Sequence, residues 1–201
     1  MRLSVAMIVC DEADFLPHCL GTTGPLADEW CVVDTGSRDA TPDIARAHGC
    51  RVTTLAWADD FAAARNAAID CSTGDWVLVL DADEVIAPAD HAALRALLAG
   101  PPAGYRLTTR NYTNDSGAQG FVPVAPDDPH AAGFAGWTPS TKVRLFPNLP
   151  AARFRGRVHE LVNDALLEAG VPLRDSAVPV HHYGARRAQA AEAALLEDGL
   201  E

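Results

Sequence analysis

The chain contains 201 residues, of which 48% are hydrophobic and 21% charged, a composition typical of a globular protein with one substantial core. The formal net charge of -11 argues against nucleic acid or an anionic membrane as a partner, because both require a basic surface. The N-terminus lacks a basic segment followed by an apolar one, and no apolar run approaches the length of a membrane span. We therefore expect a cytoplasmic protein without a transmembrane segment, in which all five cysteines are structural.

The first half of the chain alternates between strand and helix patterns. Helical patterns begin at Asp14, Thr41, Asp59 and Asp90, and the third of them is expected to close at Gly74. Thr41 followed by Pro42 is typical of an N-cap and the first helical position. Between these helices, apolar runs predict buried strands at 3–9, 30–33, 51–55 and 76–80. This alternation predicts a parallel sheet with right-handed crossover connections.

The second half of the chain has a different pattern after the two prolines at 101 and 102. Residues 105–109 alternate as in a half-exposed strand, and short strands are expected at 142–146, 158–162 and 178–181. Residues 111–141 are rich in Gly and Pro, and we expect them to form a long mobile loop that closes over a ligand. Residues 185–201 are expected to be a helical tail.

The stretch 75–84 (DWVLVLDADE) carries the main functional signal. Five apolar residues predict a buried strand, and carboxylates follow at its C-terminal end, where open α/β sheets bind ligands. Asp81 and Asp83 are two residues apart, so on an extended backbone they project to the same side. Two carboxylates suit Mg²⁺ or Mn²⁺ shared with substrate phosphates. A polar exit from a strand gives the same short pattern, so this motif alone leaves both interpretations open.

Acidic residues also follow the first two predicted strands. Asp11 and Glu12 follow the first, and Asp34 follows the second. In a parallel sheet these ends share one edge, where clustered carboxylates require a cation or hydroxyl donors. Asp34 suits recognition of a ribose hydroxyl or of a base N–H. A turn in which its side chain binds the backbone near Gly36 explains it equally well.

Several segments together resemble the successive signatures of glycosyltransferase family 2. The resemblance covers residues 3–184 in the expected order and is closest to lipopolysaccharide-core glucosyltransferases and peptide glycosyltransferases. Two departures are the replacement of Lys-Asn-Glu by Cys10-Asp11-Glu12 and of an aromatic residue by Ala185. The matching segments are 34–41 (DTGSRDAT), 61–66 (FAAARN), 74–84 (GDWVLVLDADE), 143–146 (VRLF), 154–160 (FRGRVHE) and 182–184 (HYG).

The resemblance implies a GT-A fold, an α/β architecture with a Rossmann-like, mostly parallel sheet between helices and a smaller mixed or antiparallel C-terminal part. It implies one domain over 1–184, with a nucleotide-sugar-binding half (1–100) and an acceptor-side half (101–184). The implied activity is inverting transfer of a hexose from a nucleoside-diphosphate sugar, such as a UDP-sugar, with Mn²⁺ or Mg²⁺. The acceptor would be a hydroxyl of a glycan, glycolipid or peptide, as in cell envelope polysaccharide biosynthesis, which leaves room for peripheral membrane contact.

The family pattern also assigns roles to individual residues. Asp83 and His182 would hold the metal, with His182 favoured over His181 by the motif register, and Glu160 would be the general base. Glu160 is expected on a short apolar strand between Val158 and Val162, where an ion pair with an arginine at 155 or 157 is the alternative. The donor would contact Asp11, Glu12, Asp34, Arg65 and Asp81.

Four other functions share parts of this pattern. A degenerate transferase would bind sugar nucleotides without turnover. A haloacid-dehalogenase-like phosphatase uses Asp-x-Asp, but after its first strand. A nucleotidyltransferase needs a Gly-rich loop after strand one, and a dinucleotide dehydrogenase needs GxGxxG there; neither motif follows residues 3–9.

Overall fold

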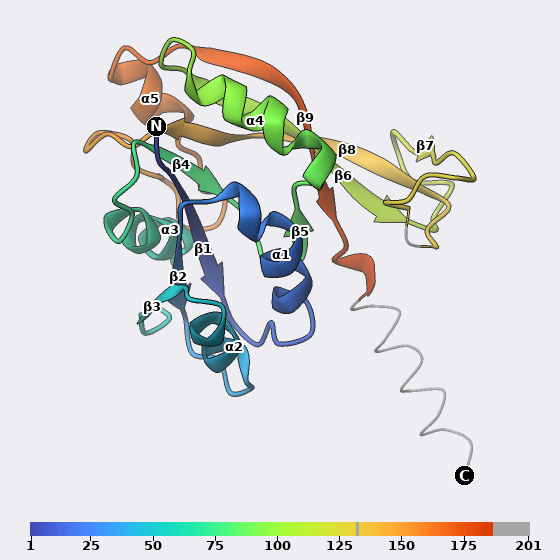
Figure 1. Cartoon of the computed structure of the whole chain (residues 1–201), viewed down its shortest axis with the longest axis horizontal. Helices are drawn as coiled ribbons and strands as arrows, with labels where there is room; N and C mark the ends of the chain where they lie inside the picture. The colour runs from blue at the N-terminus through green and yellow to red at the C-terminus, as the bar shows by residue number, and fades with distance from the viewer. Residues whose placement is uncertain (132, 187–201) are drawn as a thin grey trace.

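One mixed sheet organises the described part of the chain, residues 1–131 and 133–186 of this computed structural model (Figure 1). Its nine strands follow the order β3-β2-β1-β4-β8-β6-β9-β5, and β7 pairs with β8 outside that path. Among the described residues, no helix combines the length and the apolar character that a membrane span requires. Residues 187–201 of the expected helical tail lie outside the described residues.

The first half of the sheet is parallel, as expected. β1 lies between β2 and β4, and β3 pairs with the outer edge of β2. The predicted alternation of strands and helices is confirmed. The elements are β1 (Leu3–Val9), α1 (Leu16–Thr23), the 3-10 turn η1 (Gly24–Leu26), β2 (Glu29–Asp34), α2 (Thr41–Ala47), β3 (Arg51–Thr54), α3 (Phe61–Asp70) and β4 (Trp76–Val79).

The second half of the sheet is mixed. The antiparallel pair of β4 and β8 joins it to the first half, and β6 then pairs with β8 antiparallel and with β9 parallel. β5 pairs antiparallel with β9, which places Glu84 opposite His182. The elements are β5 (Glu84–Val85), η2 (Pro88–Asp90), α4 (His91–Leu98), β6 (Gly104–Thr113), β7 (Val122–Pro123), β8 (Gly136–Pro147), α5 (Asn163–Glu168) and β9 (Leu173–His182).

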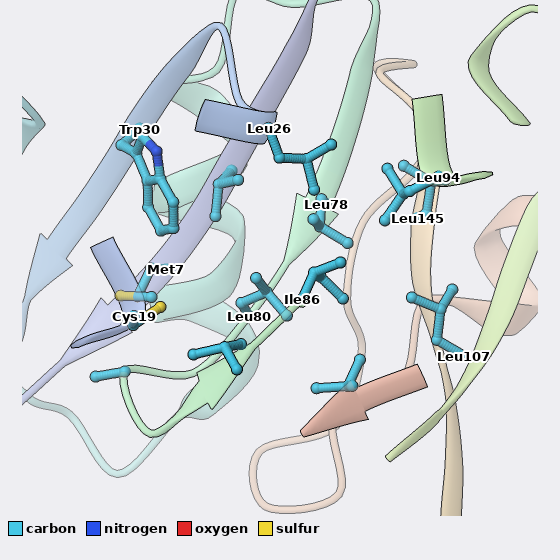
Figure 2. Close-up of a cluster of buried hydrophobic side chains, with 14 of the residues drawn as sticks. Met7, Cys19, Leu26, Trp30, Leu78, Leu80, Ile86, Leu94, Leu107 and Leu145 are labelled. Atoms are coloured by element: carbon cyan, nitrogen blue, oxygen red, sulfur yellow. The ribbon is translucent and has the colours of Figure 1, made fainter. Parts of the chain in front are cut away.

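Both faces of the sheet carry a hydrophobic core, because alternate residues of the central strands point to opposite sides. On one face, Met7 and Leu78 pack with residues of α1 and α4, and Figure 2 shows this cluster extending to Leu107 and Leu145 of the mixed half. On the other face, Val77 packs with residues of α3 and α5. Two helical layers therefore hold the C-terminal ends of the parallel strands in fixed positions.

The helix boundaries were predicted correctly in part. Gly49 follows α2 with a φ of 78°, a left-handed conformation that favours glycine at the end of a helix. The N-cap assigned to Thr41 is wrong, because Thr41 lies inside α2 and its backbone N–H donates to Asp39 Oδ1 at 2.9 Å. The predicted close of the third helix at Gly74 is also wrong, since α3 ends at Asp70.

The expected loop over 111–141 is strand at both of its ends, so the loop is shorter than the sequence predicts. β6 continues to Thr113 and β8 begins at Gly136, and the two strands pair directly from Thr113↔Gly136 inwards. Only 114–135 connects them, with the short β7 inside it. Figure 1 shows this arm extending away from the parallel strands. Polar residues such as Thr138 and Ser140 hid the strand, because strand pairing depends on partners far away in the sequence.

The strand expected over 158–162 is wrong as well. Residues 157–159 form a bend, closed by a single bridge between Arg155 and Leu161. Gly156 makes this bend possible with a φ of 99°, and a Cβ at that position would lie 2.7 Å from the carbonyl oxygen of His159. Glu160 is therefore presented by a loop and not by a strand.

Candidate active site

A cleft of about 680 Å³ opens at the C-terminal ends of β1, β2 and β4. Six of the residues predicted for the site line it: Glu12, Arg65, Asp81, Asp83, Glu160 and His182. The other lining residues are Ile8, Val9, Cys10, Thr35, Trp57, Phe61, Ala82, Lys142 and Val158. The cleft therefore joins the two halves of the chain, since its residues come from both.

Asp81 lies between two guanidinium groups. Its Oδ1 is 2.5 Å from Arg65 Nη2, and its Oδ2 is 4.0 Å from Arg144 Nη1. Burial alone would raise the pKa of Asp81, but the charges of Arg65 and Arg144 outweigh burial and hold it well below its ordinary value. Asp81 is therefore ionised near neutral pH, and one of its oxygens is already engaged by protein.

Arg144 anchors the turn that carries the acidic motif. Its Nη1 and Nη2 bind the two carboxylate oxygens of Glu84, each at 2.5 Å, and both side chains are almost completely buried. Glu84 Oε2 also accepts a hydrogen bond from the backbone N–H of Asp81 at 2.9 Å. Sequence reasoning did not assign this role to Arg144, although the motif 143–146 contains it.

Asp83 and His182 approach each other at one side of the cleft. His182 Nε2 lies 3.3 Å from Asp83 Oδ2, and His182 Nδ1 lies 2.9 Å from Asn111 Oδ1. The Asn111 NH2 group donates to Thr138 O and Ser140 Oγ, so the Oδ1 of Asn111 must be the acceptor for a hydrogen bond from the Nδ1–H of His182. In neutral His182 the lone pair is therefore on Nε2, the atom that faces Asp83.

The protonation of His182 is coupled to the acidic motif. Burial lowers its pKa, but the hydrogen bond and charge of Asp83, with Glu84 and Asp81 nearby, raise it above the ordinary value. His181 points elsewhere: its Nδ1 is 2.8 Å from the hydroxyl oxygen of Tyr112. Burial, followed by the charges of His130 and Arg110, lowers the pKa of His181 to about 4.

The donor atoms at Asp83 and His182 fit a divalent ion that is shared with a substrate. Among the described residues, no group of three or more His, Cys, Asp or Glu side chains is arranged to hold an ion by itself. One carboxylate oxygen and one imidazole nitrogen are a donor set that Mn²⁺ accepts, whereas Mg²⁺ prefers oxygen alone. Phosphate oxygens and water would complete the coordination.

Glu160 faces Arg65 across the cleft. Glu160 Oε1 lies 3.5 Å from Arg65 Nε, and the Glu160 side chain is 17% exposed. The alternative partners have other contacts, because Arg155 pairs with Glu168 and Arg157 binds backbone carbonyls. Arg65 Nη1 is buried and has no hydrogen-bond partner among the described residues. Arg65 thus connects Glu160 to Asp81, and its Nη1 remains available as a hydrogen-bond donor.

Asp11 and Asp34 do not belong to the described residues that line the cleft. Asp11 adopts a φ of 54°, which aspartate tolerates better than most residues, and its Oδ1 accepts the N–H of Arg38 at 2.7 Å. Asp34 is 5% exposed, and its Oδ1 accepts the N–H of Ser37 at 3.2 Å. Both carboxylates therefore shape the loop after β2, and Thr35 lines the cleft in their place.

Sequence reasoning also missed part of the cleft wall. It singled out neither Lys142 nor Trp57, and it gave Phe61 no role in the site. Phe61 is 38% exposed and Trp57 42% exposed. A tryptophan in a loop between a predicted strand and a predicted helix was the available signal, because such loops carry ligand contacts in α/β folds.

Comparisons with known proteins match most of the chain to one family. The model of Glycosyl transferase family 2 matches residues 4–149. A TPR repeat-containing protein of Synechococcus elongatus is 42% identical over 167 residues, which cover 83% of this chain and 36% of that protein. The SPbeta prophage-derived glycosyltransferase SunS of Bacillus subtilis is 29% identical over 85 residues, 41% of this chain and 20% of SunS. The chain thus spans about a third or less of these relatives.

Two solved structures are similar over most of the chain. TarS 1–349 of S. aureus matches with a TM-score of 0.60 at 14% identity, covering 90% of this chain and 60% of that one. Glucosyl-3-phosphoglycerate synthase of Mycobacterium tuberculosis, in complex with phosphoglyceric acid, matches with a TM-score of 0.56 at 18% identity, covering 91% and 72%. These similarities confirm the expected GT-A fold. The family model matches residues 4–149, which is well over half of this chain, and the chain therefore belongs to glycosyl transferase family 2.

Proposed function

We propose that this domain transfers a hexose from a UDP-sugar to an acceptor hydroxyl in a Mn²⁺- or Mg²⁺-dependent reaction that inverts the anomeric configuration. The observation that carries the proposal is the meeting of Asp83 and His182 in the cleft, with Asn111 fixing the imidazole. Outside this chain, the structure of S. aureus TarS 1–349 in complex with UDP has the same fold, which makes UDP the first nucleotide to test.

The donor fits the cleft in one direction. The diphosphate belongs beside Asp83 and His182, where a bound divalent ion would neutralise the leaving group. We then propose that the nucleoside lies towards β1 and β2, near Glu12 and Thr35, which the order β3-β2-β1-β4 and the lining of the cleft support. Neighbouring strands lie about 4.8 Å apart, so two strand positions match the extent of a nucleoside beside its diphosphate. Arg65 lies on the opposite wall of this path.

Glu160 is proposed as the base. The acceptor oxygen attacks the anomeric carbon, the bond from that carbon to the diphosphate oxygen breaks, and its electron pair leaves with UDP. The hydroxyl proton passes to Glu160, whose carboxylate Arg65 contacts and orients. One displacement of this kind inverts the configuration and needs no covalent nucleophile.

The metal assignment is tested by Asp83→Ala. We expect this variant to lose Mn²⁺-dependent UDP binding in calorimetry, because it removes one of the two protein donors. Asp43→Ala is the matched control, since Asp43 is 84% exposed and remote from the cleft on α2. Unchanged UDP affinity in Asp83→Ala with Mn²⁺ present would contradict the assignment.

One observation supports a second candidate, a degenerate domain that binds sugar nucleotides without turnover. Asp81, the first acid of the motif, is engaged by Arg65, which leaves few protein donors for an ion. Release of UDP from UDP-glucose or UDP-N-acetylglucosamine distinguishes the candidates. Binding without any release, even with acceptors present, would favour the binding module.

A further inference from the structure

Exposed hydrophobic side chains gather at one mouth of the cleft. Four of the seven large hydrophobic residues that the described chain exposes lie in two neighbouring segments, the start of α3 with the loop before it and the loop that presents Glu160. We call them the apolar rim: Trp57, Phe61, Val158 and Leu161. Their exposed fractions are 42%, 38%, 65% and 51%. A gathering of this kind on an otherwise charged surface is typical of a contact site.

The rim is held in place by specific bonds. Arg157 Nη2 donates to the carbonyl oxygen of Ala58 at 2.9 Å, and its Nε donates to that of Asp59 at 3.2 Å. In return, the N–H of Phe61 donates to the carbonyl oxygen of Arg157 at 2.9 Å. Asp59 has a φ of 53° and accepts a hydrogen bond from the indole N–H of Trp57. These bonds join the two segments into one surface, and they hold Asp59 in its left-handed backbone conformation.

The rim is continuous with the position proposed for the acceptor. Val158 and Glu160 are two residues apart on one loop, and both line the cleft. Phe61 lies one helical turn before Arg65, which contacts Glu160. The charged end of the donor belongs at Asp83 and His182. A molecule whose hydroxyl reaches Glu160 therefore also touches the rim.

The chemistry of the rim indicates the kind of acceptor. Val158 and Leu161 are aliphatic and offer no flat face or hydrogen-bond donor for a sugar ring. Trp57 and Phe61 pack edge to face at 4.8 Å between ring centroids, so the edge of one ring covers the face of the other. The net charge of -11 disfavours an acceptor linked to a lipid phosphate and disfavours an anionic membrane surface.

We infer that the apolar rim binds an aliphatic or aromatic side chain of a peptide acceptor, next to the Ser or Thr whose hydroxyl is glycosylated. Residues one or two positions apart in an extended peptide lie about 3.3 to 7 Å apart, and the rim residue Val158 is likewise only two positions from Glu160 in the chain. The inference rests on the proposed function, because it takes the position of the hydroxyl from Glu160. In the transfer, the peptide oxygen gains the sugar, UDP leaves, and the hydroxyl proton goes to Glu160.

The test compares two synthetic peptides, acetyl-Gly-Phe-Ser-Gly-Gly-amide and acetyl-Gly-Gly-Ser-Gly-Gly-amide. Each is incubated with UDP-glucose or UDP-N-acetylglucosamine and Mn²⁺, and glycopeptide is measured by mass spectrometry. We expect kcat/KM to be about tenfold higher or more for the Phe peptide, the discrimination that an apolar pocket typically provides. Trp57→Ala and Val158→Ser should bring this ratio close to one. Leu167→Ala, at an exposed leucine of α5, is the matched control and should keep it.

Several outcomes would overturn the inference. Equal transfer to the two peptides would do so, as would transfer to methyl glucoside or maltose with neither peptide used. Binding to phosphatidylglycerol vesicles that is lost in Trp57→Ala would assign the rim to a membrane. Failure of both peptides while Mn²⁺-dependent UDP binding is intact also counts against a peptide acceptor. If the wild-type protein does not bind UDP at all, the proposed function itself is overturned. The failure of the peptide inference and the failure of the proposed function are therefore distinguishable.

Discussion

At the scale of single residues, the candidate metal site depends on a side chain that would not itself bind metal. Asn111 Oδ1 accepts a hydrogen bond from the Nδ1–H of His182, and the NH2 group of Asn111 donates in turn to two residues of β8. A metal-binding histidine needs its lone pair on the nitrogen that faces the ion, and a hydrogen bond at the other nitrogen fixes that arrangement. Nothing in the local sequence around Asn111 indicates this role, because the contact exists only once β6 and β9 are paired.

Asn111→Ala tests this dependence. We expect Mn²⁺-dependent UDP affinity to fall by roughly 10- to 100-fold, the usual effect of removing a partner that orients a metal-binding histidine. Asn111→Asp supplies a carboxylate acceptor for the same proton and should restore most of the affinity. Calorimetric titration of UDP with Mn²⁺ measures both. Full affinity in Asn111→Ala would show that the orientation of His182 is set by other contacts.

At the scale of elements, the turn between β4 and β5 is supported from across the sheet. Arg144 of β8 binds Glu84 through two hydrogen bonds, and Glu84 binds the backbone N–H of Asp81. The acidic motif is therefore fixed to the antiparallel half of the sheet. This arrangement keeps Asp81 and Asp83 at the cleft, although residues 80–83 between β4 and β5 form neither helix nor strand.

Glu84→Gln should destabilise the protein strongly. It removes the carboxylate that binds both Nη atoms of the buried Arg144 and leaves only the more distant Asp81, and breaking such a buried pair typically costs about 3–5 kcal/mol of unfolding free energy. Glu168→Gln is the control, because Glu168 and Arg155 are 61% and 58% exposed and such surface pairs contribute little to stability. Urea unfolding curves give both values. Equal, small effects in the two variants would mean that the buried pair is dispensable.

The elements also show where sequence reasoning succeeds. The parallel strands were predictable because each is a continuous apolar run between local helix signals, as in 3–9 and 76–80. The arm of β6 and β8 was not, because Thr138 and Ser140 lie in a strand through pairing with distant residues of β6. The loop that presents Glu160 was mistaken for a strand, since Val158 and Val162 alternate with it although Val158 is 65% exposed.

At the scale of the whole molecule, the cleft lies where the parallel and the mixed halves of the sheet meet. Asp81 and Arg65 come from the first half, and Glu160 and His182 come from the second. The family motifs predicted that these residues would be close together. For Asp34 the sequence left two interpretations open, and the hydrogen bond from the Ser37 N–H agrees with the one in which its side chain binds the backbone near Gly36. The pairing of Arg65 with the carboxylates of Asp81 and Glu160 could not be predicted from the sequence either.

Glu160→Gln tests whether the two halves act together. Because Glu160 is the proposed base and lies away from Asp83 and His182, we expect transfer to fall by about 10²–10⁴-fold while UDP affinity stays near the wild-type value. The amide keeps the size of the side chain and can still contact Arg65, so the fold should persist. Initial rates with the accepted peptide and calorimetry with UDP and Mn²⁺ give the two quantities, and Glu168→Gln is again the control. If Glu160→Gln instead loses UDP binding or unfolds while transfer per bound donor is unchanged, Glu160 holds Arg65 in place and another group accepts the proton.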